Sequence, residues 1–234
     1  DCRDKLQGVP GVTHVVYAAR YDHSGGELES VDTNLQMLSN LLTAVKDRPG
    51  LRHVHVVHGT KYYGHNAGPR PVPYHEDAPR IDRPVFYYAQ QDCLVQQHEG
   101  QAWDWSISRP HTFCDQVLDE PRSITLLVAL YASILKELGH PLRFPGTQRA
   151  FETRTQFTWL PMLARSIEWM MTDPACANQA FNVVNGDTHR WSELWPVIAD
   201  YFGMACGDPQ PELFVAYAAA RTRLAAGGSL GWTL

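Results

Sequence analysis

VDTNLQMLSNLLTAVKDRPGLRHVHVVH, residues 31–58, decides the fold of this chain. In its first half the apolar residues recur at spacings of three and four, which predicts a helix that ends before Pro49-Gly50. Its second half, residues 51–58, is short and rich in β-branched residues, so it predicts a strand. A similar run, VTHVVYAA at residues 12–19, precedes the helix. A strand, a helix and a strand in this order predict two parallel neighbours joined by a crossover helix.

The same alternation continues along the rest of the chain. Further helices are expected at residues 86–99, 122–138, 160–171 and 191–202, and further strands at residues 103–108, 141–144 and 180–184. We therefore expect an α/β fold with a doubly wound, mainly parallel, Rossmann-like sheet. Residues 1–112 are expected to form the remainder of a dinucleotide-binding domain. Residues 113–234 are expected to combine a smaller substrate-covering region with returning Rossmann elements.

Composition narrows the class of protein. A net charge of -5 with 19% charged residues offers no basic surface for a phosphate backbone, so nucleic acid is not an expected partner. The five cysteines are scattered and form no C-x-x-C pair, which favours a reducing cytoplasm over a disulfide-rich or zinc-binding protein. The longest apolar run, near residues 124–135, is shorter than the roughly 20 residues that cross a bilayer, so no membrane partner is expected.

A glycine-rich phosphate loop is missing from the sequence. Dinucleotide sites normally begin with a strand, then G-x-G-x-x-G, then a helix, and this chain contains no G-x-G. Either the chain is not a dinucleotide protein, or it begins after the first strands of one. The opening DCRDKLQGVPGVTHVVYAA is typical of the end of a strand, a short helix and a mid-sheet strand, which favours the second interpretation. We expect the N-terminal part of the fold to be incomplete, and the ending GWTL suggests the same of the C-terminal part.

Three motifs carry a family resemblance. They are HGTKYYG at residues 58–64, PVPYHEDAPR at 71–80 with VFYYAQQD at 85–92, and SRPHT at 108–112. From about residue 12 to residue 203 the chain resembles the extended short-chain dehydrogenases. Within them it is similar to the progesterone 5β-reductase and iridoid synthase-like family, which includes bacterial enone reductases.

The expected catalytic pair follows from this resemblance. Ordinary short-chain dehydrogenases place a lysine four residues after the catalytic tyrosine, but Gln91 stands at that spacing from Tyr87. The family takes its lysine from the loop after the previous strand, which corresponds to Lys61. Adjacent helical side chains point about 100° apart, so only one of Tyr87 and Tyr88 can face the site, and alignment with the family selects Tyr87. Where the family typically has T-G-x-K, this chain has His58 in place of the hydroxyl residue.

The resemblance implies an NADPH-dependent reductase of activated C=C bonds, with NAD as the less expected cofactor. Hydride would add to the β-carbon of a small-molecule enone, while the Tyr87 hydroxyl stabilises negative charge on the carbonyl oxygen and Lys61 favours the charged states of the site. Without the resemblance, packing in the core is the favoured interpretation of Tyr87, and a solvated loop lysine is that of Lys61.

Six residues are expected to contact the cofactor. Ala18 and Ala19 end a strand, where open α/β sheets bind ligands. The resemblance implies the other four: His58 stands in the family's T-G-x-K string, and the family runs the segment of Arg109, Pro110 and His111 along the nicotinamide half of the cofactor. Packing explains the alanines as well, and Arg109-Pro110 can instead mark the end of the strand at residues 103–108. No metal site is expected, because His53 and His55 share a strand face without a convincing third ligand. Glu76 and Asp77 are expected to be solvent-facing turn residues.

Two other functions stay open. One is a carbonyl reductase or sugar-nucleotide epimerase of the same superfamily, although the position of Lys61 argues against an epimerase, which generally keeps tyrosine and lysine on one helix. The other is a non-catalytic relative that senses NAD(P) or binds a partner. A small-molecule enone or carbonyl compound is the expected substrate class, and a homodimer is one assembly that such an enzyme can form.

Overall fold

The structure is a computed structural model that describes residues 2–21, 30–64, 68, 70–117 and 123–211. The chain divides into two compact units. The first is built from Asp1–His111 and Thr158–Asn185, and the second from Thr112–Phe157 and Gly186–Leu234. None of the described helices is both long enough and apolar enough to cross a membrane.

The first unit contains a four-stranded parallel sheet. Its strands are β1 (His14–Tyr17), β2 (His53–Val57), β3 (Asp104–Pro110) and β8 (Gln179–Val183), in the spatial order β1-β2-β3-β8. All three pairings are parallel, with His14 opposite His53, His53 opposite Asp104, and Ser106 opposite Gln179. The predicted α/β fold with a parallel sheet is confirmed.

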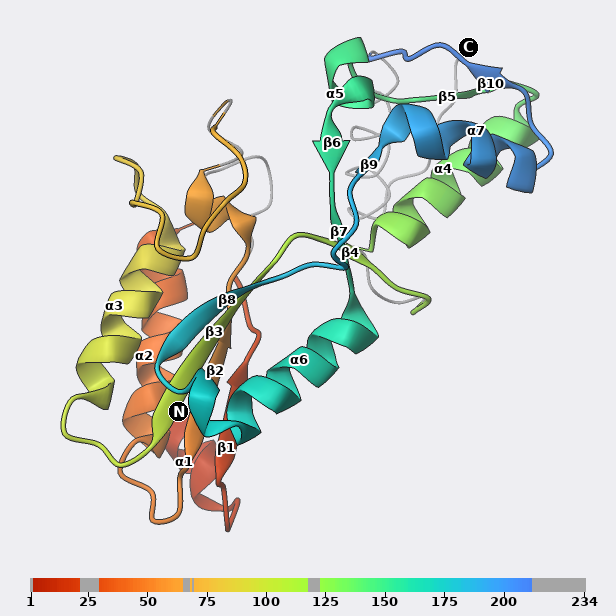
Figure 1. The fold of residues 1–234 in the computed structure, drawn as a ribbon. Helices are drawn as coiled ribbons and strands as arrows, with labels where there is room; N and C mark the ends of the chain where they lie inside the picture. Colours follow the sequence, from red (N-terminus) through yellow and green to blue (C-terminus); the bar gives the residue numbers. More distant parts are fainter. Residues whose placement is uncertain (1, 22–29, 65–67, 69, 118–122, 212–234) are drawn as a thin grey trace. The chain divides into compact units, whose positions relative to one another are not determined.

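Helices cover both faces of this sheet. Figure 1 shows α2 (Val31–Val45) and α3 (Phe86–His98) on one face and α6 (Leu160–Thr172) on the other, with α1 (Cys2–Gln7) near α2. The helix α2 spans the expected residues, and the Ser30 hydroxyl caps it by accepting a hydrogen bond from the Thr33 amide at 3.1 Å. The faces of β2 are almost wholly buried, as expected for a strand inside a parallel sheet.

The core of the first unit lies between the sheet and α2 and α3. Its fully buried aliphatic members come from both layers, namely Leu38, Leu42, Val54, Val56, Leu94 and Ile107. Alternation along β2 and β3 places Val54, Val56 and Ile107 on this face. It places His58 and Arg109 there too, farther toward the carboxyl ends of their strands.

The second unit holds the remaining elements. Its helices are α4 (Ile124–Glu137), α5 (Gln148–Glu152) and α7 (Trp191–Tyr201). Its strands are short: β4 (Thr112–Cys114), β5 (Leu142–Arg143), β6 (Arg154–Thr155), β9 (His189–Arg190) and β10 (Cys206–Gly207), while β7 (Phe157–Trp159) runs from this unit into the first. The strand predicted at residues 141–144 is present as β5, but it pairs with β10 and does not belong to the main sheet. An aromatic core of Tyr131, Phe144 and Trp195 holds the unit together.

One boundary differs from the sequence-based expectation. The strand predicted to stop at Ser108 continues through Pro110, because β8 pairs with it there, Arg109 opposite Asn182 and Pro110 opposite Val183. The last β2–β3 pair joins Val57 and Ser108, so the missing amide proton of Pro110 interrupts no bond on that side.

Candidate functional site

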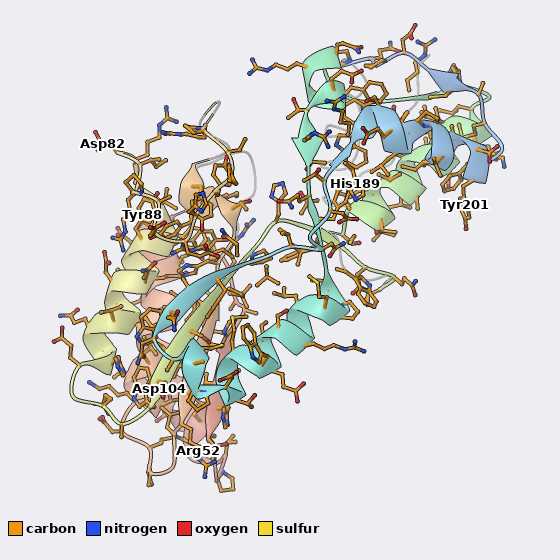
Figure 2. All side chains as sticks on the ribbon, in the orientation of Figure 1. Arg52, Asp82, Tyr88, Asp104, His189 and Tyr201 are labelled. Carbon is orange, nitrogen blue, oxygen red and sulfur yellow. The ribbon has the colours of Figure 1, made fainter. Side chains whose placement is uncertain are left out.

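The site lies at the carboxyl ends of the parallel strands of the first unit. In a parallel sheet the carboxyl ends of all strands lie along one side of the sheet, which we call the carboxyl edge. Ligands of open α/β folds bind just outside it. Ala18 and Ala19 follow β1 and are exposed, while His58 follows β2. Figure 2 shows Tyr88, in the first turn of α3, beside this edge. Arg52 directly precedes β2 and Asp104 begins β3, and both lie at the opposite end of the sheet.

The segment that carries Lys61 is fixed against the first turn of α3. It forms a short 3-10 helix, η1 (Thr60–Tyr63), in which the half-buried Lys61 contributes its carbonyl to the Gly64 amide at 3.0 Å. Tyr62 and Tyr63 are buried in one cluster with Phe86 and Tyr87 of α3. The structure therefore places Lys61 and Tyr87 on two segments that pack directly together.

The two adjacent tyrosines of α3 have different surroundings. The Tyr88 hydroxyl donates to the Tyr62 carbonyl at 2.5 Å and accepts from the Ile81 amide at 3.1 Å, so it is used by the fold. The Tyr87 hydroxyl instead reaches the carboxyl edge of the sheet. A Cβ added to Gly59 would lie 3.3 Å from that hydroxyl and 3.5 Å from the Pro110 carbonyl oxygen. Only glycine at residue 59 leaves ordinary contact distance for the Tyr87 hydroxyl.

His58 lies directly against Tyr87. The two rings stack with centroids 4.5 Å apart at 24°, and the imidazole is only 3% exposed. Neither ring nitrogen has a hydrogen-bond partner among the described residues. Burial, with the Arg109 cation as a second cause, holds the pKa of His58 well below its ordinary value. A neutral imidazole with unused hydrogen-bonding capacity therefore lies beside the Tyr87 ring.

Arg109 is buried, and its guanidinium is bound by protein groups. It stacks on the Tyr62 ring with 3.5 Å from Cζ to the ring centroid. One terminal nitrogen donates to the Tyr63 hydroxyl and to the Glu76 carbonyl, both at 2.9 Å, and the other donates to Gln91 Oε1 at 3.3 Å. Its Nε atom is buried without a partner in the described part of the chain.

A second set of bonds ties the proline-rich segment, residues 70–84, to the sheet. Asn182 of β8 accepts from the Tyr63 hydroxyl at 2.7 Å, and its amide side chain donates to the Tyr74 carbonyl at 3.0 Å. Its backbone amide donates to Glu76 Oε1 at 2.8 Å. As expected, Glu76 and Asp77 are exposed and lie in a turn. Glu76 also binds the sheet, because its carboxylate accepts from the Asn182 amide and its carbonyl accepts from Arg109.

The remaining expected residues lie along the same edge. His111 approaches the Thr60 hydroxyl through Nδ1 at 2.8 Å, and its amide donates to the Thr158 hydroxyl at 2.9 Å. After β1, the buried Asn34 side chain fixes the chain beyond Ala19 by accepting from the Tyr21 amide at 2.8 Å. The structure thus brings His58 and Tyr87 into contact and places the Pro110 carbonyl near Gly59. It joins His111 to Thr60, the neighbour of Lys61, and leaves Ala18 and Ala19 one strand away.

No metal centre is formed by the residues that the structure describes, since they contain no group of three or more suitable ligands. His53 and His55, which share one face of β2, are bound by serines of β3 instead. The Ser106 hydroxyl meets His53 Nε2 at 2.7 Å and His55 Nδ1 at 2.8 Å, and the Ser108 hydroxyl meets His55 Nε2 at 2.9 Å.

Sequence comparison finds relatives along most of the chain. A family model described as a PRISE-like Rossmann-fold domain matches residues 1–215. A 3-oxo-Delta(4,5)-steroid 5-beta-reductase of Arabidopsis thaliana is 35% identical over 211 residues, which are 87% of this chain and 54% of that protein. An (S)-8-oxocitronellyl enol synthase of Nepeta racemosa is 34% identical over 212 residues, 87% of this chain and 53% of that protein. The chain spans about half the length of the curated relatives it matches.

Solved structures of similar fold are more distant in sequence. RMD from Pseudomonas aeruginosa, complexed with NADPH, has a TM-score of 0.70 at 18% identity, covering 89% of this chain and 73% of that one. The UDP-glucuronic acid 4-epimerase of Bacillus cereus, in complex with NAD, has a TM-score of 0.66 at 15% identity, covering 89% and 65%. At these identities the likeness shows the fold alone.

Proposed function

Because the chain belongs to the family of PRISE-like Rossmann-fold domains, we propose that its protein is an NADPH-dependent reductase of activated C=C bonds in small-molecule enones. The observation that carries the proposal is the position of the Tyr87 hydroxyl, which lies at the carboxyl edge beside Gly59, with the Tyr87 ring stacked on His58. The names of the steroid reductase and of the enol synthase support a reaction that passes through an enol or enolate.

Tyr87 would act on the oxygen of the substrate. When hydride adds to the β-carbon of an enone, the electrons of the double bond move to the carbonyl oxygen, and negative charge develops there. A phenol hydroxyl donates a hydrogen bond that strengthens as this charge grows, which is how oxyanion stabilisation lowers a barrier. The enolate then takes a proton at the α-carbon to give the saturated ketone.

Lys61 would supply positive charge to the same reaction. Its segment packs on the turn that carries Tyr87, and an ammonium close to the developing oxyanion favours the charged state. Burial holds the pKa of His58 well below its ordinary value, so Lys61 and not His58 would supply this positive charge. Lys61 of η1 would thus replace the lysine that ordinary short-chain dehydrogenases carry four residues after the tyrosine. In this chain that position on α3 is Gln91, which accepts a hydrogen bond from Arg109.

The carboxyl edge fits the nicotinamide half of a dinucleotide, which would supply the hydride. Ala18 and Ala19 leave room there, and the unpartnered nitrogens of His58 offer hydrogen bonds that the described protein groups do not use. Pro110 and His111 end β3 and follow it at the same edge. These groups would hold and orient the ring, and the protein's role would be positioning.

The preference for NADPH and the location are parts of the same proposal. One structural neighbour binds NADPH and another binds NAD, so the family resemblance is what favours NADPH here. Cys93, Cys114, Cys176 and Cys206 form no disulfide with one another, which supports a reducing, cytoplasmic location.

The test is to measure cofactor oxidation over a panel of cyclic, linear and steroid enones. NADPH and NADH should be compared, using both this chain and the longest reading frame that contains it. We expect NADPH to be consumed and the saturated ketone to be formed by the longer protein. A lack of oxidation with every enone would refute the proposal.

Carbonyl reduction is the second candidate, because a hydroxyl placed like that of Tyr87 can also stabilise an alkoxide. Product analysis separates the two reactions: a saturated ketone supports enone reduction, and an allylic alcohol supports carbonyl reduction. A protein that only binds its partner or cofactor would form neither product, and Tyr87→Phe would leave its binding unchanged.

A further inference from the structure

The Arg109 guanidinium is a buried cation that pairs with no carboxylate of the described residues. Its side chain belongs to a residue that is 1% exposed, and no described carboxylate oxygen lies within 4.0 Å of it. Burial of an unpaired charge is costly, so proteins retain it where its hydrogen bonds achieve something that an apolar side chain cannot.

What these bonds achieve is the joining of three segments that are separate in sequence. The guanidinium stacks on Tyr62 and donates to Tyr63, both in the segment that carries Lys61. It donates to the Glu76 carbonyl in the proline-rich segment, and to Gln91 on α3, one helical turn after Tyr87. Arg109 itself is anchored by the pairing of β3 with β8.

We propose that Arg109 is a positioning residue, whose planar guanidinium sets the arrangement of the Lys61 segment relative to Tyr87. This inference rests on the proposed reductase function for its kinetic consequence. Its structural part, the fixing of three segments by one side chain, stands independently.

The shape of the group explains why arginine is needed. A guanidinium offers donors in a rigid fork and a flat face for stacking, and Arg109 uses both, the fork on Tyr63, Glu76 and Gln91 and the face on Tyr62. A lysine ammonium has neither the fork nor the face. Arg109→Lys therefore keeps the charge and removes the positioning.

The experiment compares Arg109→Lys and Arg109→Gln with the unchanged protein in enone reduction. Misplacement of a reacting group by about 1 Å costs on the order of 100-fold in rate, so we expect kcat to fall about 10- to 100-fold in both variants. KM for the enone should change by less than about threefold, because Arg109 acts through other residues and does not bind substrate.

Hydrogen exchange provides a readout that does not depend on activity. In both variants the amides of Tyr62 and Gly64, which are bonded within the Lys61 segment, should exchange at least about tenfold faster. The amides of Val54 and Val56 in β2 should keep their protection. Tyr63→Phe removes one acceptor of Arg109 and should raise the exchange rates of the same two amides by a smaller factor. This variant allows the same test if an Arg109 variant does not fold.

Ser106→Ala is the matched control. Ser106 is fully buried on the same strand, but on its other face, where it binds His53 and His55. It should lower stability without changing kcat or the exchange of residues 62–64.

The outcomes separate the two proposals. If the unchanged protein reduces no enone, the reductase proposal fails, and the exchange measurement still decides the role of Arg109. If it reduces enones and both Arg109 variants keep kcat within about twofold and keep the protection of residues 62–64, the positioning role is wrong.

Discussion

Two buried polar clusters lie on opposite faces of the same pair of strands. The histidine–serine cluster comprises His53 and His55 of β2 with Ser106 and Ser108 of β3, on the face that α6 covers. The arginine–tyrosine cluster lies on the other face, at the carboxyl ends of these strands, and consists of His58, Tyr62, Tyr63, Tyr87 and Arg109. Both contain buried histidines, and they differ in how their polar atoms are satisfied.

In the histidine–serine cluster no side-chain polar atom of the described residues is buried without a partner. In the arginine–tyrosine cluster, three buried atoms have no partner among the described residues: both ring nitrogens of His58 and the Nε of Arg109. An unpaired buried polar group costs about 1–3 kcal/mol, so the second cluster is less stable than the chain could make it. The first cluster therefore holds β2 and β3 together, while the unused hydrogen-bonding capacity of the second supports our proposal that it meets a ligand.

Tyr87→Phe should produce the largest effect on activity. It removes the hydroxyl that we assign to oxyanion stabilisation and leaves the ring stacked on His58. Loss of such a donor costs roughly 100- to 1,000-fold in kcat, while the fold is retained. The measurement is steady-state enone reduction with NADPH, alongside a thermal unfolding curve.

Tyr88→Phe is the control for this variant, because the neighbouring hydroxyl binds Tyr62 and Ile81 within the fold. It should lower stability by about 1 kcal/mol and change kcat far less than Tyr87→Phe does. The opposite result, with Tyr88→Phe the less active variant, would exchange the roles of the two tyrosines.

Ser106→Ala should affect the other cluster alone. It leaves ring nitrogens of His53 and His55 without their partner, which should cost about 1–3 kcal/mol of the free energy of unfolding. Urea denaturation measures the loss. Enone reduction should be unchanged at temperatures where the variant is folded. A fall in kcat comparable with that of Tyr87→Phe would mean that the two clusters are not independent.

Acid should weaken the folded state through the buried histidines. Burial lowers the pKa of His53 to about 4 and that of His55 to about 3, with Asp104 partly opposing the shift at His53. Unfolded histidine titrates near 6.5, so below that pH the unfolded state binds protons that the folded state does not. The stabilisation is therefore complete above pH 6.5 and is lost as the pH falls toward the folded pKa values.

Each of these histidines should contribute a slope of up to about 1.4 kcal/mol per pH unit between pH 6.5 and its folded pKa. Urea denaturation at several pH values measures the sum, and histidine NMR measures the individual residues. The imidazoles of His53, His55 and His58 should show no titration between pH 5.5 and 8, and a midpoint near 6.5 at any of them would contradict the burial that the structure gives.

Sequence patterns predicted the main sheet of the first unit well. The helix at residues 31–45 has the expected limits, and all four strands of the sheet were expected close to where they lie. Apolar periodicity suffices for such elements, because the core imposes it over many residues. The two- and three-residue strands of the second unit, such as β6 and β9, were not predicted, since a run that short has no periodicity to detect.

The connections within the site were not predictable from the sequence for a different reason. Asn182 binds Tyr63 across 119 residues, and no local pattern connects the two. Arg109 was expected near the cofactor because of the family resemblance, and the structure shows its guanidinium turned to Tyr62, Tyr63 and Gln91. The motif HGTKYYG contained the relevant tyrosines, but only the fold shows which group each one meets.

Gly59→Ala should produce the smallest effect, and it tests the arginine–tyrosine cluster where it meets the Tyr87 hydroxyl. The backbone of Gly59 is extended, with φ 174° and ψ 176°, so alanine is tolerated there and the unfolded chain loses entropy, which keeps stability within about 1 kcal/mol. The new methyl group would lie 3.3 Å from the Tyr87 hydroxyl, closer than most contacts, and would displace it by a few tenths of an ångström. We expect kcat to fall about three- to tenfold, because catalysis is more sensitive to the position of this hydroxyl than folding is. Gly50→Ala is the comparison for a glycine with no atom near its Cβ, although its φ of 90° makes it the more destabilising change. If Gly59→Ala keeps full kcat while Tyr87→Phe does not, the hydroxyl acts from a position other than the one beside Gly59.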